Sequence, residues 1–262
     1  MSADSRWRLD GARAVVTGGT RGIGLAVVLE LLELGASVVT AGRDLDEVDP
    51  RLAAARDAGR VTLIATDLAA AEGRAALIAA MPDAWDTLDI LVNNVGTNVR
   101  QPSLAVTADD YRRILDTNVT CAWDLSRALH PRLAASGRGA IVNVGSVAGQ
   151  VSVGTGAVYA MSKAAIEQLT RYLAVEWARD GIRVNAVAPW YIRTPLVEPI
   201  LGDPATLARV LAVTPMGRVG EPHEAAAAIA FLCLPAASFV TGQAIAADGG
   251  FLAYGFSPRP LV

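Results

Sequence analysis

Apolar residues follow two alternating patterns along the chain: short uninterrupted runs rich in valine and isoleucine, and longer stretches where they recur every three or four positions. The short runs predict buried β-strands, and the longer stretches predict helices with one buried face. Seven strands are predicted, at residues 13–18, 36–42, 60–67, 88–96, 139–146, 182–189 and 242–250. Helices are predicted at 22–35, 107–135, 157–180 and 221–234, and in an alanine-rich stretch on each side of the third strand.

The predicted strands are apolar at consecutive positions rather than at every second one, which is typical of a parallel sheet covered on both faces. Together with the alternating helices, this predicts an α/β fold with a doubly wound (Rossmann) seven-stranded parallel sheet. No linker or repeat divides the chain, so residues 1–262 are predicted to form one domain. A proline-containing segment at about 190–215 is predicted to form a lid over the carboxyl ends of the strands.

Composition excludes several classes of partner. The net charge is −3 and no basic patch or arginine-rich run occurs, so nucleic acid and anionic membranes are disfavoured. No apolar run reaches the ~18 residues of a membrane span, and residues 1–11 lack the apolar core of a signal peptide. We expect a cytoplasmic protein. Cys121 and Cys233 lack metal-ligand spacing, so we expect buried thiols and no metal site.

A glycine-rich turn, TGGTRGIG at 17–24, follows the first predicted strand and opens the first predicted helix. Three of its four glycines, Gly18, Gly22 and Gly24, have the spacing G-x-x-x-G-x-G, which differs from the G-x-G-x-x-G fingerprint. Glycines let a backbone approach a pyrophosphate closely, and the following helix offers free N–H groups at its amino end. A tight turn without a ligand is the alternative, but the position in a βαβ unit favours a dinucleotide.

The end of the second predicted strand bears on which dinucleotide is bound. NAD-binding units commonly place an acidic residue there, to bind the ribose 2′-hydroxyl. This chain instead has Arg43, and Arg21 lies on the glycine turn. Two guanidinium groups could bind a 2′-phosphate, so NADP(H) is favoured over NAD(H). The neighbouring Asp44 could serve as the acidic partner, and two solvated arginines are a further alternative.

Tyr159 and Lys163 lie four residues apart in the predicted helix 157–180, so they share one face of it. A phenol has a pKa of about 10, and a neighbouring cation lowers it. The pair could therefore supply a proton to the alkoxide formed when a ketone accepts a hydride. A core tyrosine beside a solvated lysine is the alternative. Ser146 ends the fifth strand and could donate to the carbonyl oxygen; it lacks the G-x-S-x-G elbow of a nucleophile.

These residues together resemble the short-chain dehydrogenase/reductase family over essentially the whole chain. TGGTRGIG resembles its cofactor turn, NNVG at 93–96 its N-N-A-G motif, and Asp67 its adenine contact. Asn118, Ser146, Tyr159 and Lys163 resemble its catalytic four, with Ser146 at the usual 13 positions before Tyr159. The segments from 188 to 256 most resemble tropinone reductases. In one departure, Trp190 follows Pro189 where the family usually has glycine, which affects the expected shape of the substrate pocket.

The resemblance implies further site residues. Lys163 would also bind the ribose hydroxyls, and Asn118 would hold a water in a proton relay. The residues implied to contact the cofactor are Gly18, Thr20, Arg21, Gly22, Ile23, Arg43, Asp67, Leu68, Asn94, Gly96, Tyr159, Lys163, Pro189, Ile192 and Thr194. Those expected in an apolar substrate pocket are Val95, Val147, Val151, Val153, Trp190, Tyr191, Leu196, Val197 and Ile200.

The expected reaction is NADPH-dependent reduction of a ketone to a secondary alcohol. No charged anchor is evident in the pocket, which favours a neutral or amine-bearing ketone over a 2-oxo acid. A 3-oxoacyl-thioester reductase is the alternative, with Arg100 and Arg193 as candidate contacts for a carrier. A non-catalytic dinucleotide sensor is a third hypothesis. The helices 107–135 and 157–180 are expected to pair in a homotetramer or homodimer, with residues 251–256 completing a neighbour's contact or the pocket wall.

Overall fold

Seven parallel strands form one sheet in the computed structural model of the protein, which describes residues 4–255. The strand order is β3-β2-β1-β4-β5-β6-β7, so the predicted doubly wound fold is confirmed. The strands are β1 (Arg13–Thr17), β2 (Ser37–Gly42), β3 (Val61–Ala65), β4 (Ile90–Asn93), β5 (Ala140–Val144), β6 (Arg183–Pro189) and β7 (Ala244–Ala247). The order reverses between β1 and β4, and ligands bind such sheets at the carboxyl ends of the strands beside that point.

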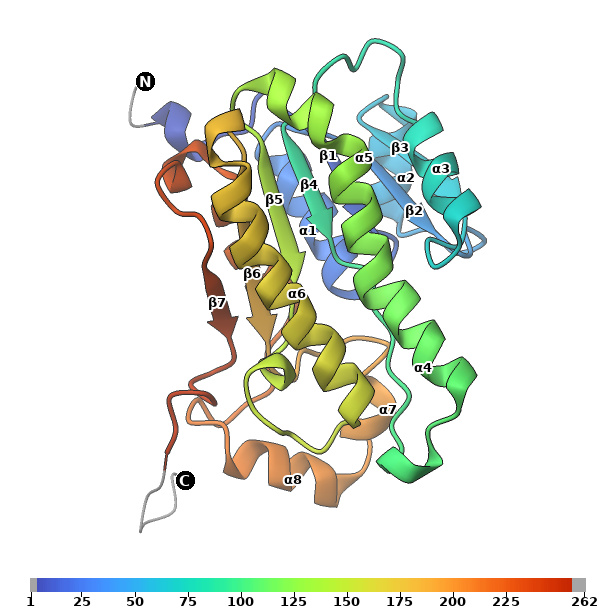
Figure 1. The fold of residues 1–262 in the computed structure, drawn as a ribbon, viewed down its shortest axis with the longest axis vertical. Coiled ribbons are helices and arrows are strands. Elements are labelled where there is room, and N and C mark those ends of the chain that lie inside the picture. The colour runs from blue at the N-terminus through green and yellow to red at the C-terminus, as the bar shows by residue number, and fades with distance from the viewer. Residues whose placement is uncertain (1–3, 256–262) are drawn as a thin grey trace.

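Helices cover both faces of the sheet (Figure 1). Side chains of α1, α2 and α9 pack in one hydrophobic core, and side chains of α3, α5 and α6 pack in the other. The α-helices are α1 (Gly22–Glu33), α2 (Pro50–Asp57), α3 (Ala71–Ala79), α4 (Ala108–Leu115), α5 (Cys121–Ser136), α6 (Ala157–Glu176), α7 (Glu198–Leu201), α8 (Pro204–Ala212) and α9 (Pro222–Cys233).

Alternate residues of each central strand enter opposite cores. In β1, Val16 packs with α1 and α9, whereas Val15 packs with the helices on the other face; Val92 and Leu91 of β4 divide in the same way. All four are fully buried, because successive side chains of a strand point to opposite faces. This two-sided burial is why the strands are apolar at consecutive positions in the sequence.

The predicted long helices differ from the observed ones at two places. The stretch predicted as one helix at 107–135 comprises α4, a π-helical turn at Asp116–Thr120 and α5. The helix predicted at 157–180 ends at Glu176, and a 3₁₀ turn follows at Ala178–Asp180. The predicted lid segment forms α7 and α8, which lie beyond the carboxyl ends of the strands (Figure 1).

No helix within residues 4–255 is both long enough and apolar enough to cross a bilayer. Cys121 and Cys233 are unpaired and buried. Burial raises the pKa of each thiol to about 12, because desolvation disfavours the thiolate. Both cysteines therefore act as small core residues.

Candidate active site

The glycine turn at the end of β1 forms a cradle for a phosphate group. Gly18 and Gly22 have φ angles of +67° and +57°, a region in which only glycine is unstrained. The next helix, α1, starts at Gly22, and no side chain caps its amino end. Its first N–H groups are therefore available to an anion, which the helix dipole also favours. This geometry fits the pyrophosphate of a dinucleotide.

The end of β4 is bonded to this turn. The Asn94 side-chain amide donates to the carbonyl oxygens of Thr17 (2.9 Å) and Gly18 (3.2 Å), and its main-chain N–H donates to the Thr17 hydroxyl (2.8 Å). A Cβ atom on Gly18 would lie 2.9 Å from the Val95 side chain. Asn94 and Val95 therefore lie at the cradle, at the point where the strand order reverses.

Residues from more distant parts of the chain reach the same turn. A Cβ atom on Gly22 would lie 3.3 Å from the Thr194 side chain, which places Thr194 beside the first residue of α1. Ile192 is buried and pairs with Gly220 in an isolated parallel bridge. Asp67 is exposed after β3, and its carboxylate accepts a main-chain N–H bond from Ala69 at 3.0 Å.

The two arginines predicted to bind a 2′-phosphate start from touching segments. A Cβ atom on Gly42 would contact the Thr20 side chain at 2.6 Å, so the end of β2 packs on the glycine turn. Arg43 and Arg21 are the next residues of these two segments, and both are exposed. Within residues 4–255, neither guanidinium has an acidic partner within ion-pair distance. The nearby Asp44 carboxylate accepts a main-chain N–H bond from Asp46 (2.8 Å).

Tyr159 and Lys163 lie together on α6. The Lys163 Nζ atom is 5.7 Å from the centre of the Tyr159 ring and donates to the Val144 carbonyl oxygen at 2.7 Å. The lysine side chain is almost completely buried, with 4% of the residue exposed. Burial lowers the pKa of Lys163 to about 8, because removing water disfavours the ammonium form. The helix therefore carries an ammonium group that can lose its proton near neutrality.

Lys163 is also the only lysine among the 23 basic Lys and Arg residues of the chain. Every other basic position is arginine, a residue that stays protonated in proteins. The lone lysine therefore marks a position that needs an amine. The single lysine in the composition is a sequence signal for this site that is independent of the Y-x-x-x-K spacing.

The hydroxyl of Ser146 belongs to the same group. Ser146 follows β5, and its Oγ atom accepts a bond from the Ala148 N–H at 3.1 Å. Burial raises the pKa of Tyr159, while a hydrogen bond with Ser146 and the charge of Arg100 oppose that rise. Ser146 and Tyr159 are therefore neighbours, as the family resemblance implied. Because burial is the largest of these effects, the pKa of Tyr159 lies above its usual value and the phenol keeps its proton.

Asn118 completes the group from the π-helical turn between α4 and α5. Its Oδ1 atom accepts the Thr97 N–H (2.8 Å), and its amide donates to the Thr97 carbonyl (3.0 Å) and the Ser162 hydroxyl (2.9 Å). A Cβ atom on Gly96 would lie 3.6 Å from Asn118 Oδ1 and 3.5 Å from Lys163 Nζ. Asn118 and Lys163 thus approach one point beside Gly96, and such π-turns occur frequently at functional sites.

Ser162 is a residue that the sequence analysis did not single out. It is fully buried, and its hydroxyl donates to the Tyr159 carbonyl at 2.7 Å while accepting from Asn118. Ser162 therefore connects the π-turn to the first turns of α6. A polar residue directly before Lys163 in an alanine-rich helix was the available signal.

Of the residues predicted for the substrate pocket, only two line the cleft beside β7 that the structure contains. Trp190 and Tyr191 line a cleft of about 360 Å³ beside β7. The Trp190 indole stacks on Phe251 at 3.9 Å and donates to the Thr214 hydroxyl at 3.0 Å. The remaining predicted pocket residues are not among those lining this cleft: Val95, Val153, Val197 and Ile200 are half-buried, Val151 and Leu196 are exposed, and Val147 is buried. Phe251 packs on Trp190 but is not among the residues that line the cleft, while Phe256 lies outside the described residues.

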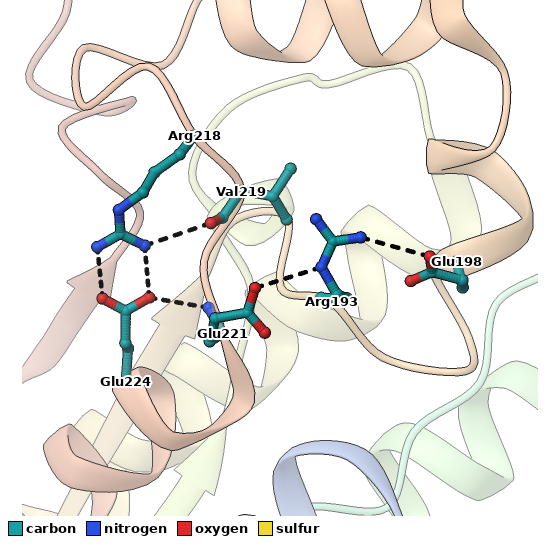
Figure 2. Close-up of polar contacts among 6 residues, drawn as sticks. All are labelled: Arg193, Glu198, Arg218, Val219, Glu221 and Glu224. Atoms are coloured by element: carbon teal, nitrogen blue, oxygen red, sulfur yellow. Dashed lines mark hydrogen bonds and ion pairs between the residues drawn. The ribbon is translucent and has the colours of Figure 1, made fainter.

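Ion pairs join the start of the predicted lid segment to the loop and helix that follow it (Figure 2). Arg193 donates to Glu221 at 3.2 Å and to Glu198 at 3.4 Å. Arg218 makes a bidentate contact with Glu224, at 2.7 and 2.6 Å. Arg193 is thus already neutralised by two carboxylates, which disfavours it as a contact for the phosphate of a carrier.

Comparison with known proteins identifies the family. The family model described as Enoyl-(Acyl carrier protein) reductase matches residues 18–252. A tropinone reductase homolog of Arabidopsis thaliana is 48% identical over 98% of both chains. The chain belongs to the short-chain dehydrogenase/reductase family. A further Arabidopsis thaliana tropinone reductase homolog, described as chloroplastic, is 45% identical over 99% of this chain and 81% of its own.

Solved structures of short-chain dehydrogenase/reductases agree with this assignment. A gluconate 5-dehydrogenase from Burkholderia cenocepacia, in complex with NADP and tartrate, superposes with a TM-score of 0.89. It is 34% identical, and the match covers 97% of this chain and all of that one. The predicted family is therefore confirmed. As a member of it, this protein is an NAD(P)-dependent oxidoreductase that acts on small molecules.

Proposed function

We propose that this short-chain dehydrogenase/reductase uses NADPH to reduce a ketone to a secondary alcohol, with Tyr159 as the proton donor. The observation that carries the proposal is the grouping of Ser146, Tyr159, Lys163 and Asn118 next to the glycine cradle. When bound, the dinucleotide supplies the hydride. The cradle around Gly18 and the free amino end of α1 would hold its pyrophosphate.

The protein's own residues perform the remaining steps. The Ser146 hydroxyl donates to the carbonyl oxygen, which stabilises the negative charge that develops there. Tyr159 transfers its phenolic proton to the same oxygen. The Lys163 ammonium stabilises the phenolate that remains, because an adjacent positive charge favours the ionised form. Asn118 and Lys163 both approach the space beside Gly96, where a water could pass a proton back to the site.

Two unpaired arginines support NADPH over NADH. Arg21 and Arg43 extend from contacting segments and are exposed without an acidic partner. Guanidinium groups bind phosphate in a bidentate manner, so these two residues would bind the 2′-phosphate. The relative from Burkholderia cenocepacia contains NADP. The ion pairs of Arg193 remove one of the two contacts considered for the 3-oxoacyl-thioester alternative and leave Arg100 as the other. The presence of both Tyr159 and Lys163 counts against a sensor without turnover.

We further propose that the protein forms a homotetramer or homodimer through α4, α5 and α6. Several large apolar side chains on these helices are exposed: Tyr111, Trp123, Met161, Tyr172 and Val175. The three helices lie side by side on one face of the molecule (Figure 1). Clustered exposed apolar residues are typical of association surfaces, and most oligomers of this kind are symmetric. The cytoplasmic location stays a prediction.

Replacement of Tyr159 by phenylalanine tests the reaction. Tyr159→Phe removes the transferable proton and keeps the ring, so turnover with NADPH and a ketone panel should fall by about a thousandfold or more, in line with losing a general acid. NADPH binding, measured by fluorescence titration, should be nearly unchanged. Tyr172→Phe, an exposed tyrosine on the same helix, is the matched control. Full activity of Tyr159→Phe would contradict the mechanism.

A further inference from the structure

Two segments cross at the amino end of α6, close to Tyr159. The Asn98 amide donates to the Thr155 carbonyl oxygen at 3.0 Å. Gly156 has a φ angle of +110°, and a Cβ atom there would lie 3.2 Å from the Val99 carbonyl oxygen. Residues 98–101 are therefore fixed against residues 155–156, and Arg100 lies between two residues whose carbonyl oxygens face Gly156, directly before the helix that carries Tyr159.

Arg100 has no acidic partner, unlike Arg193 of the lid segment and Arg218 directly after it. Arg193 and Arg218 are neutralised by carboxylates (Figure 2), whereas Arg100 is exposed and forms no ion pair with residues 4–255. Its charge is close enough to lower the pKa of Tyr159, against the effect of burial. An unpaired guanidinium near the proton donor is available to a substrate anion, the kind of contact for which the sequence already made Arg100 a candidate.

The same crossing holds two buried polar atoms that lack partners. The Oδ1 atom of Asn98 and the Oγ1 atom of Thr155 are both buried and make no hydrogen bond within the described structure. Buried polar atoms are nearly always bonded, so these two are sites that a ligand or an ordered water can satisfy. Both atoms are enclosed where Asn98 bonds to Thr155, so hydroxyl groups of a substrate would bind them once that contact opened.

We infer that Arg100 binds a carboxylate of the substrate, and that Asn98 and Thr155 bind its hydroxyl groups. The substrate class is therefore a hydroxylated oxo-carboxylic acid, not the neutral or amine-bearing ketone favoured from the sequence. This inference rests on the proposed ketone reduction and names its substrate. The carbonyl to be reduced would lie at Ser146 and Tyr159, with the carboxylate towards Arg100.

The test compares two ketones that differ in the carboxylate. The wild-type protein with NADPH should reduce 5-oxo-D-gluconate with a higher kcat/KM than L-sorbose, which has a hydroxymethyl group in place of the carboxylate. Arg100→Met should raise the KM for the oxo acid by roughly tenfold to a hundredfold, the equivalent of one charge-assisted hydrogen bond. It should change kcat and the KM for L-sorbose much less, and Arg100→Lys should restore part of the loss.

Inhibition provides a second measurement that depends on no particular turnover substrate. Tartrate should compete with whichever ketone the enzyme reduces, threitol should not, and Arg100→Met should abolish the difference. Arg179→Met, an exposed arginine after the far end of α6, is the matched control and should leave every value unchanged. Equal effects of Arg100→Met on acid and neutral ligands would overturn the inference. Failure of the wild type to reduce any ketone would overturn the proposed function itself.

Discussion

At the scale of single residues, the choice of lysine at position 163 follows from acid–base chemistry. The ammonium of Lys163 is buried against the Val144 carbonyl, and its pKa is lowered to about 8. A guanidinium stays charged at any physiological pH, so an arginine there could not titrate. A chain that uses arginine at every other basic position therefore retains an amine where a proton has to be exchanged.

The lowered pKa of Lys163 can be measured directly. Protein labelled with ¹³C at the lysine ε-carbon should give one side-chain resonance, with a titration midpoint near pH 8 in the folded apoprotein and near 10.4 in urea. Because the folded-state pKa is the lower one, the unfolded state binds more protons between these values. The lysine's contribution to stability therefore rises with pH across that window. A folded-state midpoint above 10 would contradict this prediction.

The cofactor preference is a second prediction at this scale. Arg43→Ala should raise the KM for NADPH by roughly tenfold or more, because a charge-assisted bond to the 2′-phosphate is lost. The KM for NADH should change much less. Steady-state kinetics with both cofactors measure this ratio, with Arg113→Ala, an exposed arginine of α4, as control. Equal changes for the two cofactors would remove the argument for a 2′-phosphate site.

At the scale of elements, the first helix is positioned by close contact with the glycine turn. A Cβ atom on Gly24 would overlap the carbonyl oxygen of Gly18 and the side-chain amide of Asn94. Both groups are fixed, since Asn94 also bonds to Thr17 and Gly18. The packing of α1 therefore determines the shape of the cradle, and a single added methyl group would change both.

Gly24→Ala should accordingly lower the free energy of unfolding by about 1–3 kcal/mol, as overpacking does, and weaken NADPH binding. Gly202→Ala is the control, because a Cβ atom there would lie 3.6 Å or more from its neighbours and its φ of −67° suits alanine. Thermal unfolding with and without NADPH measures both effects. If Gly24→Ala matched Gly202→Ala, the close contact would have no energetic role.

The elements differ in how far the sequence predicts them. The strands were predictable because burial on both faces leaves an apolar run, and the pairing of Tyr159 with Lys163 was predictable from helical spacing. The place of Ser146 beside Tyr159 was predictable only from the family resemblance. The π-turn that orients Asn118 has no periodic signal, because one extra residue barely disturbs a helical pattern. The stacking of Trp190 on Phe251 and the place of Arg100 depend on contacts between distant segments, which no local pattern encodes.

At the scale of the whole molecule, the exposed apolar residues of α6 are the basis of the proposed association surface. Tyr172 and Val175 are 65% and 81% exposed although they lie on a helix that packs against the sheet on its other side. Burial of such residues against a second copy would stabilise the assembly by about 25 cal/mol for each Å² of apolar surface removed from water. The same helix carries Tyr159 at its other end, so association would support the site from behind.

Charged substitutions test this surface. Tyr172→Glu combined with Val175→Glu should lower the molar mass measured by light scattering, because like charges would face each other across a symmetric contact. Leu104→Glu places the same charge at a fully exposed apolar position outside these helices and should leave the mass unchanged. An unchanged mass for the double variant would exclude α6 from the interface.

Because Lys163 is the chain's one lysine and is buried, its chemical modification would report how often the crevice around it opens to solvent. Apart from the α-amino group, the chain offers amine-directed reagents one target, and only 4% of that residue is exposed. A reagent such as pyridoxal 5′-phosphate followed by borohydride would therefore modify the crevice and leave the arginine-covered surface untouched. The rate of that modification would measure how often solvent reaches Lys163. The fall in this rate when a ligand is added would measure the fraction of protein molecules that have the ligand bound.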